Sequence, residues 1–164
     1  MRQLRKAARE IAWLLRFWFL RHGRGVDLDR TVRVGRSVTF DRSHPRGIHI
    51  GRNTYITNDV TILTHDHARS KWDMHTVIGE RCFIGNGAII LPGVTIGDEV
   101  IIGAGSVVTR DVPSHSIAAG NPARVIRSGI RMSDDARLIP DAEGDTGGTM
   151  HVPADKGCRP AKSV

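Results

Sequence analysis

The feature that most constrains the fold of this chain is an aliphatic residue that returns at every sixth position. The run is Ile78, Ile84, Ile90, Ile96, Ile102 and Val108, and glycine follows four of its six members. Small or β-branched side chains stand four residues after each aliphatic residue, at Cys82, Ala88, Val94, Val100, Ser106 and Val112. Neither an α-helix nor a plain alternating strand produces a six-residue period with glycine at a fixed phase. The period therefore indicates an internal repeat, in which each hexad contributes one short strand and a turn.

Three hexads are expected to close one triangular coil, with the aliphatic side chain inside and with glycine allowing the chain to change direction. The same phase occurs upstream, but the spacing widens to ten residues between Phe40 and Ile50 and to sixteen between Ile62 and Ile78. A repeat that leaves its register over a polar stretch and then resumes indicates a loop extruded from the coil. We therefore predict two such loops, and the second contains the sequence THDHARSKWDMH.

The segments on either side of the repeat differ in character. Residues 1–23 place apolar side chains at helical spacing and most of their basic residues elsewhere, which predicts a basic amphipathic α-helix. Such a helix would pack on the main domain or a neighbouring subunit, or would lie on an anionic membrane with its aromatic residues at the interface. Residues 24–128 form the predicted β-helix domain. Residues 129–164 have few apolar side chains and no period, so we expect a disordered, flexible tail.

Charge and cysteine content narrow the possible partners and compartments. The chain has 24 Lys and Arg against 17 Asp and Glu, which favours anionic partners such as phosphate-bearing cofactors or a membrane surface. Nucleic acid is not expected as a partner, because aromatic residues are scarce and no recognition motif is present. Cys82 and Cys158 suggest no disulfide framework and fit a cytoplasmic location. The apolar N-terminal run is too short to span a bilayer, so any membrane contact would be peripheral, at the inner face.

One part of the chain, about residues 34–127, resembles the left-handed parallel β-helix acyltransferases of the hexapeptide-repeat superfamily. The resemblance rests on LPGVTIG, GAGSVVTRDVP and GNPARVIR, which occur together and in this order. It is strongest to the branch of maltose, galactoside and virginiamycin acetyltransferases and of polysaccharide O-acetyltransferases. The resemblance implies an all-β fold, a homotrimer, and acetyl-CoA bound in the cleft between neighbouring β-helices. It also implies transfer of an acetyl group to a saccharide hydroxyl without a metal.

The same resemblance assigns a catalytic base. In the sugar and antibiotic acetyltransferases the catalytic histidine ends the pattern Ile-x-Thr-x-x-His, which places His67 at the base position and His65 at a variable one. The chemistry needs such a group, because a hydroxyl that attacks a thioester must lose its proton and imidazole titrates near neutral pH. His67 is therefore the predicted base in a direct ternary-complex attack, with His65 as the second candidate. Asn58, Asp59 and His65 are also candidates for acceptor binding.

Matched motif positions supply the predicted cofactor contacts. In order from the pantetheine arm to the CoA phosphates, they are Asn86, Ala104, Thr109, Arg110, Arg124 and Arg127. Guanidinium groups suit phosphates because they donate charge-assisted hydrogen bonds. The Asn-Phe-Asp segment that enzymes acting on small sugars carry about one coil before the histidine is absent from this chain. That absence leaves the acceptor open and favours a saccharide carried on a lipid or a polymer.

Two other classes of protein remain open at this level. A zinc enzyme like the γ-class carbonic anhydrases would hold its metal between subunits with histidines, for which His44, His49, His65 and His67 are available. The position of the first two in an early loop, and the arginines at the CoA-like positions, speak against it. A non-catalytic β-helix scaffold would keep the repeat without needing either the loop histidines or the basic positions.

Overall fold

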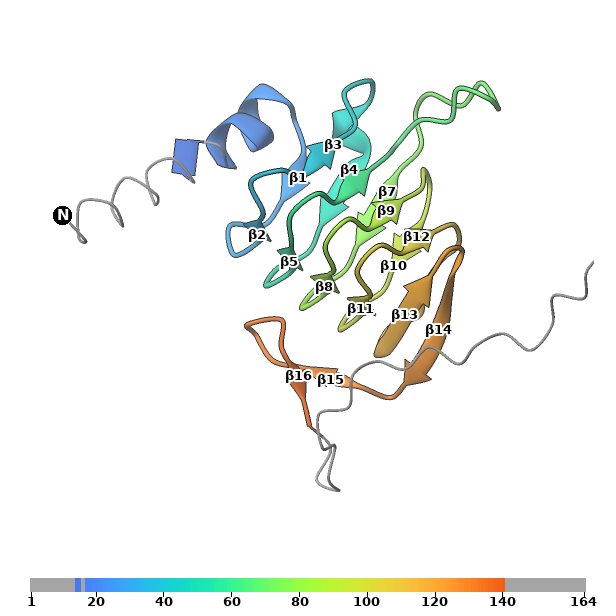
Figure 1. Cartoon of the computed structure of the whole chain (residues 1–164). Coiled ribbons are helices and arrows are strands. Elements are labelled where there is room, and N and C mark those ends of the chain that lie inside the picture. The colour runs from blue at the N-terminus through green and yellow to red at the C-terminus, as the bar shows by residue number, and fades with distance from the viewer. Residues whose placement is uncertain (1–13, 16, 141–164) are drawn as a thin grey trace, which may run out of the picture.

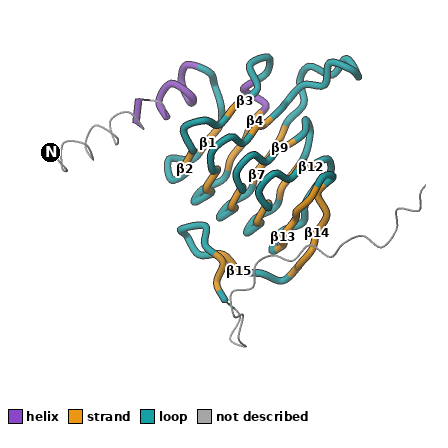
Figure 2. Tube along the Cα trace, viewed as in Figure 1, coloured by secondary structure: helices purple, strands orange, loops and turns teal. Residues whose placement is uncertain are grey.

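Figure 1 shows the chain as a computed structural model, which describes residues 14–15 and 17–140. Coils of short strands follow a helical segment, and two hairpins end the described residues, as Figure 2 also shows. The elements are η1 (Phe19–Gly23), β1 (Asp27–Leu28), β2 (Arg33–Val34), β3 (Thr39–Phe40), η2 (Pro45–Gly47), β4 (Ile48–Ile50), β5 (Tyr55–Ile56), β6 (Thr61–Ile62), β7 (Thr76–Ile78), β8 (Phe83–Ile84), β9 (Ile89–Ile90), β10 (Thr95–Ile96), β11 (Ile101–Ile102), β12 (Val107–Val108), β13 (Ser116–Gly120), β14 (Ala123–Ser128), β15 (Arg131–Met132) and β16 (Leu138–Ile139).

Strands that are neighbours in the sequence lie in different sheets. The first sheet has the order β1-β4-β7-β10, the second β2-β5-β8-β11-β13-β14, and the third β3-β6-β9-β12. All pairs in these sheets are parallel except β13 with β14, which is antiparallel. Because every third strand returns to the same sheet, the chain winds as a three-sided parallel β-helix. The left-handed sense implied by the resemblance stays a prediction.

The strand register gives the length of each coil. His49 pairs with Asp27 and with Val77, and Val77 pairs with Thr95, so successive coils span 22 residues (27 to 49), 28 residues (49 to 77) and 18 residues (77 to 95). The shortest coil equals three hexads, and the two longer ones carry the predicted loops. Residues 41–47 form the first loop, between β3 and β4, and residues 63–75 form the second, between β6 and β7. Both loops leave the corner where the third sheet meets the first, which we call the loop corner.

The aliphatic repeat forms the core, as predicted. All six members of the run from Ile78 to Val108 are at most 1% exposed, and the small residues that follow them are also buried. Burying one such side chain fully stabilises the fold by about 1.5–3 kcal/mol. The buried residues form one continuous cluster along the axis of the prism, from Leu20 to Ala118. The core therefore accounts for the period that dominates the sequence.

Glycine follows the inward aliphatic residue because the next coil leaves no room for a side chain. A Cβ on Gly79 would lie 2.7 Å from the carbonyl carbon of Gly97, and one on Gly85 would lie 2.6 Å from the amide nitrogen of Ala104. The left-handed turn itself occurs two residues later, for example at Gly87 with φ of 68°. This corrects the sequence-based expectation, which assigned the change of chain direction to the first glycine. Its role is to allow the close approach of two coils.

We expect Gly85→Ala to lower the free energy of unfolding by about 1–3 kcal/mol, because the coils must separate locally to admit the methyl group. Gly87→Asn is the matched control in the same turn, since no atom lies within 4 Å of a Cβ at position 87. Asn53 and Asp59 already adopt left-handed φ at equivalent turn positions. The control should change stability by less than about 0.5 kcal/mol in urea unfolding. Equal losses from both substitutions would contradict the steric explanation.

Two segments pack against the prism, one at its N-terminal end and one on an outer face. At the N-terminal end Leu14, Leu15, Phe17 and Trp18 are α-helical and lead into η1, where Leu20 is buried against the core. Residues 1–13 and 16 lie outside the described residues, so the amphipathic helix expected over residues 1–23 stays a prediction. Within the described part of the chain, no helix has the length and apolar character needed to cross a bilayer.

The second covering segment differs from the prediction. Residues 129–140, expected as the start of a disordered tail, form the β15–β16 hairpin and pack on the outer face of the second sheet. Ile130 and Met132 are buried there against Ile101 and Ile117. The reason is local: a few apolar residues suffice when an adjacent sheet already presents an apolar outer face. Residues 141–164, including Cys158, lie outside the described residues.

Candidate active site

The two extruded loops bring residues that are distant in sequence together at the loop corner. Phe40 pairs with Ile62, so the residues that follow them, Asp41 and Leu63, begin the two loops on adjacent coils. The hydroxyl of Thr64 donates a hydrogen bond to the carbonyl oxygen of His44 at 2.7 Å, which links the second loop to the first. At the base of the second loop, the hydroxyl of Thr76 donates to the carbonyl oxygen of Leu63 at 2.6 Å. The corner is therefore tied together by specific bonds.

The carboxylate of Asp41 organises this corner. Its side chain is 1% exposed, and one oxygen accepts hydrogen bonds from the amide of Thr64 at 2.8 Å and from Nδ1 of His65 at 2.5 Å. The other oxygen accepts from the amide of Ser43 at 2.8 Å. Burial alone would raise the pKa of Asp41, but the hydrogen bonds from Thr64, His65 and Ser43 outweigh it and lower the pKa to about 2. Asp41 is therefore an anion that fixes the orientation of the His65 ring.

The lowered pKa of Asp41 predicts how stability depends on acid. The contribution of ionised Asp41 to the free energy of unfolding should be fully present above the unfolded-state pKa of 3.8. It should disappear as the pH falls through about 2. We expect Asp41→Asn to lower the free energy of unfolding at neutral pH by about 2 kcal/mol. Urea unfolding at a series of pH values should show this difference shrinking below pH 4. Asp59→Asn, at an exposed turn, is the control without loss. A difference that is independent of pH would argue against ionised Asp41 as the cause.

Two imidazoles of the second loop face one indole. The His65 ring lies parallel to Trp72, with 5.7 Å between ring centroids, and the His67 ring stands edge-on to the same indole at 5.1 Å. The side chain of His65 is 28% exposed and presents Nε2 for chemistry, since Nδ1 is bonded to Asp41. His67 is exposed, and its ring makes no hydrogen bond within the described residues. Both candidate bases thus lie on one solvent-facing surface.

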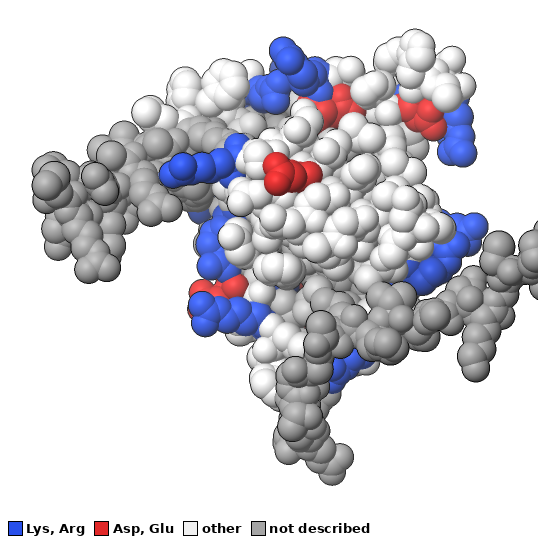
Figure 3. Space-filling view, in the orientation of Figure 1, with Lys and Arg blue, Asp and Glu red and all other residues white. Residues whose placement is uncertain are grey.

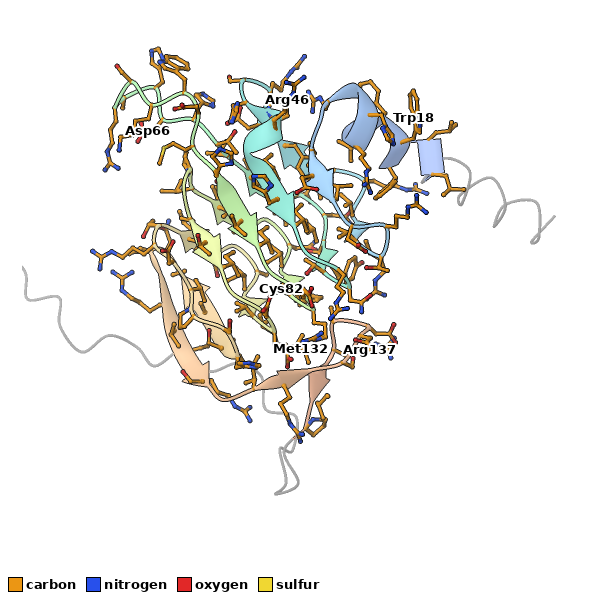
Figure 4. All side chains as sticks on the ribbon, turned by 180° about the vertical axis from the view of Figure 1, so that it is seen from behind. Trp18, Arg46, Asp66, Cys82, Met132 and Arg137 are labelled. Atoms are coloured by element: carbon orange, nitrogen blue, oxygen red, sulfur yellow. The ribbon has the colours of Figure 1, made fainter. Side chains whose placement is uncertain are left out.

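The tip of the second loop is held by its own backbone. Asp66 and Lys71 exchange two backbone hydrogen bonds, of 2.7 and 3.0 Å, and Asp66 accepts a further bond from the amide of Arg69 at 3.1 Å. The carboxylate of Asp66 also lies 3.6 Å from the guanidinium of Arg69. Asp66 therefore stabilises the turn instead of orienting a histidine. Figure 4 shows the labelled Asp66 at the far end of this loop.

Three of the predicted cofactor and acceptor positions stack along a different corner, between the second and third sheets. The amide of Gly87 donates to the carbonyl oxygen of Asn58, and the amide of Gly105 donates to that of Asn86. Asn58, Asn86 and Ala104 are therefore in a column, and all three are exposed. The left-handed φ of Asp59 matches those of Gly87 and Gly105, which gives Asp59 a structural role in its turn.

Of the remaining predicted cofactor positions, Thr109, Arg110 and Arg124 are exposed and Arg127 is half-buried, and they lie elsewhere. Thr109 and Arg110 follow β12 at the loop corner, and Arg124 lies in β14, opposite Ala119. Arg127 lies in the same strand, opposite Ile117. In Figure 3 the cationic side chains lie around the edge of the visible face, whose centre is largely uncharged.

A second cluster of histidines lies on the first sheet. Nδ1 of His49 is 3.0 Å from the carboxylate of Asp27, and its Nε2 is 2.8 Å from Nδ1 of His75. The His44 ring stands edge-on to His75, and its buried Nε2 makes no hydrogen bond. Among the described residues, no group of three or more His, Cys, Asp or Glu is arranged to hold a metal ion. Within one chain the two early histidines thus contact His75 and Asp27.

The thiol of Cys82 is unsuited to nucleophilic attack. It is buried in the core and donates a hydrogen bond to the carbonyl oxygen of Gly97 at 3.0 Å. Burial raises its pKa to about 12, so the reactive thiolate is scarce at neutral pH. Acyl transfer through Cys82 is therefore disfavoured. Sequence reasoning missed Asp41 and His75, which are bonded to residues of another coil or loop. It also missed Trp72, which contacts His65 and His67 within its own loop.

Comparisons with known proteins identify the family. Residues 75–110 match the family described as bacterial transferase hexapeptide (six repeats). The putative acetyltransferase YvoF of Bacillus subtilis is 36% identical over 119 residues, which cover 68% of this chain and 68% of that protein. The chain belongs to the hexapeptide-repeat transferase family. This membership agrees with the β-helix and with the resemblance carried by the motifs.

Solved hexapeptide-repeat structures are similar over the same region. The maltose O-acetyltransferase of Clostridium difficile 630 has a TM-score of 0.51 and 32% identity, and the match covers 62% of this chain and 68% of that one. The hexapeptide-repeat acetyltransferase VCA0836 of Vibrio cholerae, solved with acetyl-CoA, has a TM-score of 0.54 and 26% identity over 70% and 76% of the two chains.

The chain spans only part of the first curated relatives that it matches. It covers 32% of serine acetyltransferase 2 of Arabidopsis thaliana, 61% of the galactoside O-acetyltransferase of Escherichia coli and 38% of the serine acetyltransferase of that organism. These relatives are named for different acceptors, serine and a galactoside.

Proposed function

We propose that this chain is an acetyl-CoA-dependent O-acetyltransferase that acts on a saccharide or on a polysaccharide or glycolipid precursor. The observation that carries the proposal is the second loop, which sets two imidazoles against Trp72 at a solvent-facing corner of a hexapeptide-repeat helix. Similarity to a maltose O-acetyltransferase and to an acetyltransferase solved with acetyl-CoA supports the reaction class and the donor.

In the proposed reaction His67 is the general base. Its imidazole takes the proton of the acceptor hydroxyl while the oxygen attacks the thioester carbonyl carbon. The tetrahedral intermediate then collapses, the carbon–sulfur bond breaks, and the proton passes from the imidazolium to the CoA sulfur. The products are the acetyl ester and free CoA, with no covalent acyl-enzyme. The exposed ring of His67 and its motif position support this role.

A specific observation favours His65 as the alternative base. Its Nδ1 is bonded to the buried carboxylate of Asp41, which holds one tautomer and would stabilise the imidazolium formed after proton transfer. The same bond equally suits a histidine that binds the acceptor through Nε2 while His67 takes the proton. We assign His65 this second role, because its ring is held while that of His67 is free to reach the hydroxyl.

The distribution of the sites supports a homotrimer with active sites between subunits. The histidines leave the loop corner, whereas Asn86 and Ala104 lie along another corner of the same helix. Acetyl-CoA in a cleft between two copies would contact the histidines of one and the column of the other. The largely uncharged centre of the face in Figure 3 suits burial against a copy.

Mixed trimers test this arrangement. We expect His67→Ala and Ala104→Trp each to be inactive alone, because one lacks the base and the other blocks the expected pantetheine site. Co-refolded at equal amounts, they should recover about a quarter of the wild-type activity, since random assembly in a ring pairs two intact halves in one site in four. Recovery is measured as CoA release. Absence of recovery from mixtures that do form trimers would place each site within one chain.

The acceptor follows from a panel of hydroxyl compounds. Free sugars, nucleotide sugars, lipid-linked saccharides and L-serine should be offered with acetyl-CoA, and we expect turnover with the saccharides on a carrier. Acetyl-CoA and such an acceptor would meet at the cytoplasmic face of a membrane. Preference for L-serine would instead indicate the acceptor for which its serine acetyltransferase relatives are named. If the chain showed no turnover with any acceptor and did not bind CoA, the non-catalytic scaffold would become the favoured class.

A further inference from the structure

The N-terminal end of the molecule carries an exposed apolar surface that the proposed reaction does not use. Leu14, Leu15, Trp18 and Phe19 have between 54% and 65% of their surface exposed. They are next to a groove of about 670 Å³ whose apolar lining is Leu14, Leu15, Phe17 and Trp18. Clustered exposed side chains of this size mark interaction sites in water-soluble domains. We call this surface, with its groove, the N-terminal groove.

The N-terminal groove is fixed to the β-helix. Leu20 is buried, and Phe17 packs against the main core from the same helical segment. The guanidinium of Arg21 donates to the carbonyl oxygen of Leu28 at 3.3 Å, which links the helix to β1. The Trp18 ring lies 5.7 Å from that of His22. One side of the segment is thus anchored, and the other is left for a partner.

The charges around the N-terminal groove indicate the chemistry of that partner. Its polar lining is Arg21, His22 and Arg30, without an acidic residue. The sequence before it adds Arg2, Arg5, Lys6 and Arg9 against the single acid Glu10. Cores of subunit interfaces are depleted in charge, whereas helices that lie on membranes combine aromatic and aliphatic side chains with Arg and Lys. Charge complementarity therefore favours an anionic lipid surface over a second copy of the chain.

We infer that the N-terminal groove docks the protein on an anionic phospholipid bilayer. Lipid phosphates would contact Arg21 and Arg30, and Trp18 with Leu14 and Leu15 would enter the boundary between headgroups and acyl chains. In Figure 4 Trp18 of the N-terminal segment and Asp66 of the second loop both lie near the top of the view, on opposite sides of it. Docking would bring the candidate active site towards a lipid-linked acceptor, and only this last consequence rests on the proposed function.

The inference is tested with the full-length chain and vesicles, in the absence of acetyl-CoA. Co-sedimentation is measured with phosphatidylcholine vesicles, with and without phosphatidylglycerol. We expect binding that requires phosphatidylglycerol and weakens with added salt. Trp18→Ala should weaken the partition coefficient about tenfold, because a large apolar ring no longer enters the interface. Arg30→Gln should weaken the partition coefficient about fivefold, because one cation near the anionic surface is lost.

The matched controls lie in the β15–β16 hairpin, outside the lining of the N-terminal groove. Arg137→Gln removes an exposed arginine there, and Ile139→Ala removes an apolar side chain that is 38% exposed. Both should bind vesicles as the wild type does. Binding that ignores lipid charge, or Trp18→Ala and Arg30→Gln variants that match the controls, would overturn the inference. A change in oligomer mass with Trp18→Ala and no vesicle binding would instead assign the surface to a second copy. Activity on a water-soluble acceptor should be unchanged by Arg30→Gln, so the two proposals can fail separately.

Discussion

Replacing His67 with alanine is expected to lower kcat/KM for acetyl transfer by about 100- to 10,000-fold, the usual contribution of a positioned general base. The physical reason is that no other group then removes the proton as the hydroxyl attacks the thioester. The exposed ring packs edge-on to Trp72 and makes no hydrogen bond within the described residues, so its loss should leave folding unchanged. Turnover is measured as CoA thiol released, and acetyl-CoA affinity by calorimetry should match that of the wild type.

His65→Ala and Asp41→Asn provide the comparison that separates the two histidines. If His65 binds the acceptor and Asp41 orients it, both substitutions should raise the KM for the acceptor more than they lower kcat. A larger loss of kcat from His65→Ala than from His67→Ala would transfer the role of base to His65. The pH dependence of kcat/KM adds an independent measure, since removal of the true base should abolish its acidic limb.

Ile96→Ala is expected to lower the free energy of unfolding by about 2–5 kcal/mol, the cost of a large cavity in a tightly packed core. Ile96 is fully buried in β10, between Ile78 of the preceding coil and the bridge to Val112 that follows. Neighbours on two coils would therefore lose contacts at once. Chemical denaturation followed by circular dichroism provides the measurement.

Thr95→Ala is the matched control for this prediction, because Thr95 is adjacent in the same strand but exposed. It should change stability by less than about 0.5 kcal/mol. Comparable losses at positions 95 and 96 would mean that the outer face of β10 is covered in solution. Because a neighbouring subunit of the proposed homotrimer could cover this face, the oligomeric mass of both variants is measured together with their stability.

The hexad period was sufficient to predict the core and both loops. Each inward aliphatic side chain reports on one strand, and the two breaks in spacing correspond to the two longer coils. The period alone could not explain why glycine follows the inward aliphatic residues. Contact between stacked coils depends on the distance between two backbones, which no single hexad records. The positions of the glycines are given by the sequence, but the role that the sequence-based interpretation assigned to them was wrong.

The sequence predicted the loop that carries His65 and His67, but it did not predict the partner of His65. The hydrogen bond of Asp41 with His65 joins residues 24 apart and depends on two insertions that leave the same corner. The packing of residues 129–140 was also hidden, because it depends on the apolar outer face of the second sheet. In both cases the missing information was the position of a neighbouring coil, which composition and local pattern do not contain.

The return of the hexad phase after each insertion makes the core and the loops independent modules. Residues can be added to or removed from the loop corner while Ile62 and Ile78 keep their places in the prism, since the chain leaves and rejoins at fixed points. Acceptor choice could then diverge by exchange of one loop, with the scaffold and donor positions retained. A transplanted second loop from a relative is thus a compact unit for redirecting specificity.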